Sequence, residues 1–89
     1  MTIHIVQWLI VWLRGNFKMK KLSVSLSGHQ TSISLEEEFI TALHAIAIRD
    51  GKSVASIIQD IDSKRDPESN LSSAVRLWIL HRYMQSAKL

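Results

Sequence analysis

Three polar side chains, Gln30, Ser32 and Ser34, occupy every second position of a short segment that leads into three consecutive glutamates. In an extended strand, residues two apart point to the same face, so an amide and two hydroxyls would line one surface while Ile33 and Leu35 line the other. These polar groups can both donate and accept hydrogen bonds. The pattern is typical of a half-buried strand, and it leaves open whether the polar face binds a ligand or only water.

No other residues have the spacing that a metal site or a catalytic centre requires. The histidines at positions 4, 29, 44 and 81 lack the i, i+4 pairing of a zinc-binding helix. No serine lies in the context of a nucleophile elbow, and no pair of carboxylates indicates acid–base catalysis. Cysteine is absent, which excludes disulfides and thiolate ligands. We therefore predict a protein that is not an enzyme and that needs no metal or cofactor.

Two strands are expected ahead of the helices. Apolar residues alternate with serines over residues 22–26, Gly28 interrupts the pattern, and a second alternating run covers residues 30–35. The first run is either an added strand or a flexible arm. Ser34 and Glu37 have the spacing of a capping box, which predicts that a helix begins near Leu35.

Apolar residues at helical spacing predict the three helices that follow. Gly51 is suited to the left-handed position that ends the first helix, and Ser53 can cap the second. Pro67 and its polar neighbours mark a loop, and a third helix is expected over residues 71–84. The stripes comprise Phe39, Leu43, Ile46 and Ala47, then Val54, Ile57, Ile58 and Ile61, then Leu71, Ala74, Val75 and Trp78.

The first eighteen residues differ in composition from the rest of the chain. Their apolar run over residues 3–13 is too short to span a bilayer, which needs about 20 residues, and Arg14 follows the run rather than preceding it as in a secretory signal. We interpret residues 1–18 as an upstream extension from a misassigned start codon, with the domain covering residues 19–89. An interfacial anchor is the alternative, because Trp8 and Trp12 share one helical face.

Size and charge limit the class of protein. With 89 residues and 46% hydrophobic residues, the chain can form one small domain whose core is marginal, so self-association is expected. The net charge of +3 falls to +1 from Met19 onward, where nine basic residues face eight acidic ones. Bulk charge therefore does not argue for nucleic acid, and the cytoplasm is the default compartment.

The strand over residues 30–35 needs a partner for its backbone groups. A hairpin with residues 22–26 would be marginally stable by itself. Pairing with the same strand of a second subunit about a two-fold axis would satisfy these groups and bring both copies of Ile33 and Leu35 against the helices.

Residues 29–62 resemble the ribbon-helix-helix family of Arc-type and MetJ-type repressors. The most specific part is RDGKSVASII, residues 49–58, which combines a helix end, a glycine, a basic residue, a capping serine and apolar positions of the next helix. The chain is also similar to a small bacterial subgroup with a GHxTSISLEEEF opening and an NLSSAxRLWIL tail. The resemblance implies a mainly α fold with a short β-ribbon, in which an intertwined dimer carries a third, C-terminal helix.

The resemblance also implies DNA contacts through the ribbon, whose alternate side chains reach base edges in the major groove. Aligned on Gly51, the base-reading residues are Gln30, Ser32 and Ser34. Glutamine can bond adenine in a bidentate manner, and serine hydroxyls can donate or accept. The family often carries a basic residue at one of these positions, and this chain has none.

Phosphate contacts are implied at the start of the second helix. There the N–H groups of Ser53 and Val54 favour an anion, and Lys52 adds positive charge. Lys20 and Lys21 would supply further charge ahead of the ribbon, so we expect weak binding with modest salt dependence. The implied dimer core comprises Ile33, Leu35, Phe39, Leu43, Ile46, Val54, Ile57, Ile58 and Ile61.

Two hypotheses follow for the function. The first is a homodimeric transcriptional regulator that binds double-stranded DNA at an operator. The alternative is a protein-interaction module on the same dimer scaffold, antitoxin-like or a co-regulator, which binds DNA weakly and contacts a protein partner through the C-terminal helix. Neither hypothesis places the protein in a membrane.

Overall fold

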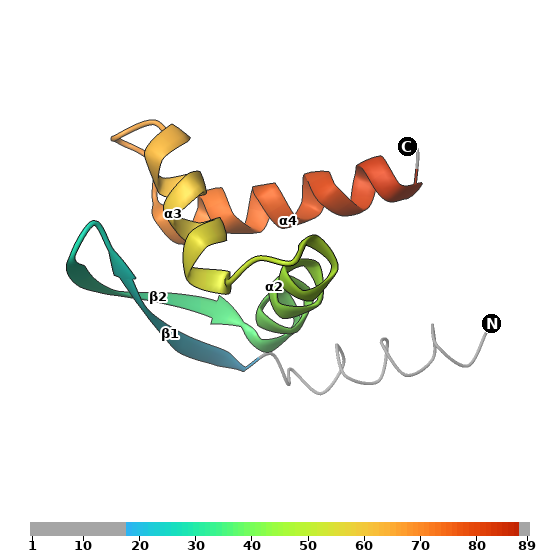
Figure 1. Ribbon diagram of the computed structural model, residues 1–89, viewed down its shortest axis with the longest axis horizontal. Coiled ribbons are helices and arrows are strands. Elements are labelled where there is room, and N and C mark those ends of the chain that lie inside the picture. The colour runs from blue at the N-terminus through green and yellow to red at the C-terminus, as the bar shows by residue number, and fades with distance from the viewer. Residues whose placement is uncertain (1–17, 88–89) are drawn as a thin grey trace.

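The computed structural model describes residues 18–87, which form a β-hairpin followed by helices (Figure 1). In chain order the elements are β1 (Met19–Leu26), β2 (His29–Glu36), α2 (Glu37–Asp50), α3 (Val54–Lys64) and α4 (Leu71–Ala87). The helices gather on one side of the hairpin (Figure 1). The expected mainly α fold with a short β-ribbon and a third helix is confirmed.

The hairpin shows that residues 22–26 belong to a strand and not to a flexible arm. Ser27 and Gly28 connect β1 to β2 with positive φ angles of 51° and 81°, as in the type I′ turn that matches the twist of two paired strands. The strands run antiparallel with Leu22 opposite Ile33. Gln59 of α3 accepts a hydrogen bond from the backbone N–H of Ser27 at 2.9 Å, which ties the turn to the helical layer.

The helix ends follow the expected capping residues in most places. Gly51 ends α2 in the left-handed conformation, with φ 65° and ψ 35°. The Oγ of Ser53 accepts a hydrogen bond from the N–H of Ser56 at 3.0 Å and so caps α3. α4 begins after Asn70, whose Oδ1 accepts from the N–H of Ser73 at 3.3 Å, and it extends beyond the expected end to Ala87.

The predicted capping box of Ser34 and Glu37 is wrong. β2 continues to Glu36, and α2 starts at Glu37 without a side-chain cap. The backbone N–H of Glu37 instead donates to the carbonyl oxygen of Lys18 at 3.0 Å. The N–H group at the start of α2 is therefore satisfied by the neighbouring strand segment and not by a side-chain cap. Ser34 lies within β2.

The core lies between the inner face of the hairpin and the helices. Of the residues predicted for the core, only Phe39 and Val54 are partly rather than fully buried, and both pack against it. Their sharing between two chains remains a prediction. The buried residues are Val24, Leu26, Ile33, Leu35, Leu43, Ile46, Ala47, Ile57, Ile58, Ile61, Val75 and Ile79.

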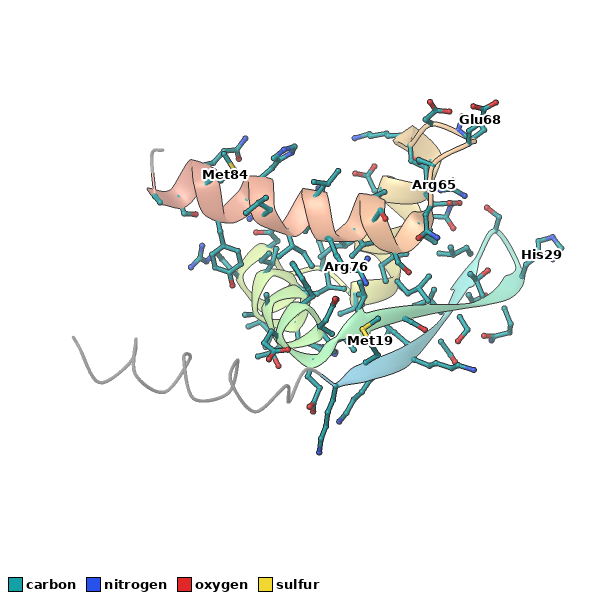
Figure 2. All side chains as sticks on the ribbon, turned by 180° about the vertical axis from the view of Figure 1, so that it is seen from behind. Met19, His29, Arg65, Glu68, Arg76 and Met84 are labelled. Atoms are coloured by element: carbon teal, nitrogen blue, oxygen red, sulfur yellow. The ribbon has the colours of Figure 1, made fainter. Side chains whose placement is uncertain are left out.

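Two arginines attach α4 to the rest of the fold. Arg76 donates a hydrogen bond to Glu36 of β2 at 2.8 Å. Figure 2 shows Arg76 between α4 and the hairpin. Arg82 forms a bidentate pair with Asp50 at the end of α2, at 2.7 and 2.9 Å, and stacks over the ring of Trp78. The hydrogen bond from Arg82 lowers the pKa of Asp50 below its usual value. α4 is therefore an integral part of the domain.

The interpretation of residues 1–18 as an extension, and the alternative membrane anchor with Trp8 and Trp12, lie outside the described residues except for Lys18. Within residues 18–87, no helix has the length and apolar content needed to cross a bilayer.

Candidate nucleic-acid interface

The predicted base-reading residues lie on the outer face of the hairpin, opposite the core. The inward residues Ile33 and Leu35 are buried, and the alternate residues Gln30 and Ser32 are exposed, with Ser34 half-buried. No helix of the described part of the chain covers this face, which agrees with the exposure of these side chains (Figure 1). Three polar groups are thus available on one surface to donate or accept hydrogen bonds.

β1 contributes residues to the same face that the sequence reasoning did not assign to it. Ser25 lies opposite Gln30 and Ser23 opposite Ser32, so the polar row of β2 has a second row beside it. Both serines are exposed. The alternation of serines with apolar residues over positions 22–26 could have indicated this, because directly paired residues of two strands point to the same face of the sheet. We call the outward residues of β1 and β2 together the outer face.

One edge of β2 is unpaired within the described chain, where the sheet has only two strands. The bond between Glu37 and Lys18 fixes which residues face this edge, because hydrogen-bonded pairs alternate with non-bonded pairs in an antiparallel ladder. The backbone N–H and C=O groups of Thr31, Ile33 and Leu35 therefore point to β1. Gln30, Ser32 and Ser34 direct theirs to the open edge.

Lys20 and Lys21, near the start of β1, point to opposite faces. Lys21 pairs with Ser34 on the outer face, whereas Lys20 pairs with the buried Leu35. The Nζ of Lys20 lies 2.9 Å from the carboxylate of Glu37, and this contact lowers the pKa of Glu37. Lys21 takes part in none of the ion pairs found among residues 18–87. Of these two lysines, only Lys21 therefore lies on the same face as the predicted base-reading residues.

The acidic residue at the end of β2 is neutralised from α4. The Nε of Arg76 lies 2.8 Å from Glu36, and both side chains are largely shielded from water. The hydrogen bond from Arg76 lowers the pKa of Glu36 below its usual 4.5. Arg76 thus compensates the negative charge of Glu36, which lies two residues after Ser34. The sequence gives no sign of this contact, because the two residues are 40 positions apart.

The predicted phosphate site at the start of α3 lies in the α2–α3 connection and not on the hairpin. The N–H of Lys52 is used by the end of α2, where it donates to the oxygen of Ala47 at 3.0 Å. Lys52 and Ser53 are exposed and Val54 is half-buried. The Ser53 side chain satisfies one N–H group of the first turn, while the positive end of the helix dipole stays accessible.

No group of three or more metal-ligating side chains occurs in the described residues 18–87. The hydrogen-bonding groups of the outer face form an extended surface, with no pairing of a nucleophile and a base.

Comparison with known proteins identifies the fold family. A model described as a ribbon-helix-helix domain matches residues 19–83, which include the hairpin, both central helices and most of α4. No match was found among curated proteins or among solved structures. The order of strand and helices, the glycine and serine between α2 and α3, and this match over most of the sequence agree: the chain belongs to the ribbon-helix-helix family.

Proposed function

We propose that the protein is a homodimeric, cytoplasmic transcriptional regulator that binds DNA sequence-specifically by inserting a β-ribbon in the major groove. The observation that carries this proposal is the outer face of the hairpin, where Gln30 and Ser32 are exposed and Ser34 is half-buried on one strand. An amide reads adenine through two hydrogen bonds, and hydroxyls contact several base edges. The membership of the ribbon-helix-helix family supports the same function.

The open edge of β2 supports a dimer. An exposed strand edge with unpaired N–H and C=O groups is a template for pairing with another strand. Two copies of β2, paired antiparallel about a two-fold axis, would satisfy these groups and create a ribbon of two identical strands. Residues that face the helices in one chain, such as Ile33 and Leu35, would then contribute to a core shared by both subunits.

Phosphate contacts would hold this ribbon in place. Lys52 and the start of α3 can bind one phosphate per subunit through positive charge and free N–H groups. Such contacts fix the orientation of the protein on the duplex without reading its sequence. Specificity would remain with the outer face.

A selection of bound fragments from random duplex DNA tests the proposal. We expect an enriched, two-fold symmetric site, because a symmetric dimer presents two copies of each reading residue. The combined replacement of Gln30, Ser32 and Ser34 by alanine should abolish retention of that site. The matched control replaces Ser73, Gln85 and Ser86, exposed residues of the same types on α4, and should bind as the unaltered protein does. Equal binding by both variants would contradict base reading by β2.

A protein-interaction module on the same scaffold is the second candidate function. It is supported by exposed apolar side chains on α4, where Leu77 is 55%, Leu80 49% and Met84 38% exposed. Such a row can bind a partner helix. This function predicts that the alanine variant of β2 keeps its partner, while replacement of Leu77 and Leu80 by serine releases it.

A further inference from the structure

Each residue of the base-reading row has a neighbour from β1 that points in the same direction. The pairs on the outer face are Ser25 with Gln30, Ser23 with Ser32, and Lys21 with Ser34. All three β1 residues are exposed, so the surface offered to DNA is two rows wide in each chain.

A dimer formed through β2 would therefore contain four strands in the order β1, β2, β2 of the partner and β1 of the partner. Neighbouring strands are about 4.8 Å apart, which puts the two β1 strands about 14 Å from each other. The major groove is about 12 Å wide and admits a two-stranded ribbon. The two β2 strands fit inside the groove, and the β1 strands come to lie above its rims, where the phosphates are.

The side chains of β1 have the chemistry that this position needs. Lys21 carries a positive charge that no acidic side chain among residues 18–87 neutralises within ion-pair distance. Ser23 and Ser25 add hydroxyls, which are common donors to phosphate oxygens. The preceding residue, Lys20, points to the other face and forms an ion pair with Glu37. The register of the hairpin thus separates the two lysines.

We propose that β1 is a phosphate-binding flank of the DNA surface, with Lys21 as its charged contact and Ser23 and Ser25 beside it. The inference rests on the proposed function and adds a division of roles. β2 reads bases inside the groove, and β1 grips the backbone on each side of it without regard to sequence.

The dependence of DNA affinity on salt tests this division, because each phosphate contact contributes about −0.9 to the slope of log K against log salt concentration on duplex DNA. Lys21→Gln removes one contact per subunit and should reduce the slope by about 2 in a dimer. Its matched control, Lys64→Gln, removes the same charge from α3, where Lys64 is 74% exposed and pairs with Asp60. The control should leave the slope nearly unchanged.

Competition between the selected site and a scrambled duplex supplies the second readout. Lys21→Gln should weaken both affinities by a similar factor, while Gln30→Ala should lower the preference for the selected site. If the unaltered protein binds no DNA, both the proposed function and this inference fail. If it binds and the slope of Lys21→Gln equals that of Lys64→Gln, or if Lys21→Gln changes the sequence preference, only the role of β1 is overturned.

Discussion

A pair of proline substitutions on the hairpin can show which strand edge joins two chains. Ser23 and Ser32 face each other across β1 and β2 and are both exposed. They form a non-hydrogen-bonded pair of the ladder, so their N–H groups point away from each other. The N–H of Ser32 faces the open edge of β2, and that of Ser23 faces the outer edge of β1. Proline lacks this N–H group and is accepted at strand positions where it is not used within the sheet.

The expected size of the effect follows from the bonds that a β2–β2 interface would lose. Ser32→Pro removes one interchain hydrogen bond in each subunit, and each such bond contributes about 0.5–1.5 kcal/mol. The dimer is then weakened by about 1–3 kcal/mol, which is about a 5- to 150-fold increase in its dissociation constant. The ring also occupies space between strands that should lie about 4.8 Å apart, which adds to the loss. Ser23→Pro places the same ring on an edge that the proposed dimer leaves free.

Sedimentation over a wide range of protein concentration measures the dissociation constants, and far-ultraviolet circular dichroism verifies that both variants are folded. We expect Ser32→Pro to be mainly monomeric where the unaltered protein and Ser23→Pro are dimers. Dimerisation that survives Ser32→Pro, or that is lost only in Ser23→Pro, would refute the argument from the open edge of β2. So would a protein that is monomeric at every concentration without any substitution.

Two further predictions concern stability. Leu35→Ala should lower the free energy of unfolding by about 2–5 kcal/mol, because Leu35 is fully buried. Urea denaturation at one protein concentration measures this loss. The control is Ile48→Ala, which should change the free energy of unfolding by no more than about 0.5 kcal/mol, because Ile48 is 82% exposed. Arg76→Met should cost about 0.5–1 kcal/mol at neutral pH. Because Arg76 lowers the pKa of Glu36 below 4.5, this ion pair stabilises the fold above that pH and less as the pH falls below it. The difference between Arg76→Met and the unaltered protein should therefore shrink in acid, and a difference that is constant with pH would contradict the assigned contact.

Local signals in the sequence sufficed for most of the fold. Gly51 and Ser53 act through the backbone groups of their own turn, so their capping roles could be predicted without knowing what surrounds them. The apolar stripes of α2 and α3 also predicted most of the buried positions, because a helix needs only its own period to place them. In α4 the predicted Val75 is buried, whereas the buried Ile79 was not predicted.

Predictions that depended on contacts between distant segments were less successful. The start of α2 was misplaced because the N–H of Glu37 bonds to Lys18, which is nineteen positions earlier in the chain. Lys20 and Lys21 were treated alike, although the hairpin register sends them to opposite faces. The pairing of Glu36 with Arg76 joins residues forty positions apart and has no signature in the sequence.

In the proposed regulator, the geometry of β2 would link dimerisation to DNA recognition. In Gln30, Ser32 and Ser34, the side chain points to the outer face while the backbone points to the open edge, so the same residues would read DNA and join the subunits. A single chain has only one copy of β2, so the ribbon of two β2 strands in the proposed function would form only in a dimer. Binding to an operator would therefore include the free energy of dimerisation, and apparent affinity would rise with protein concentration below the dimer dissociation constant. A substitution that weakens the strand edge should thus weaken DNA binding even when every reading side chain is kept.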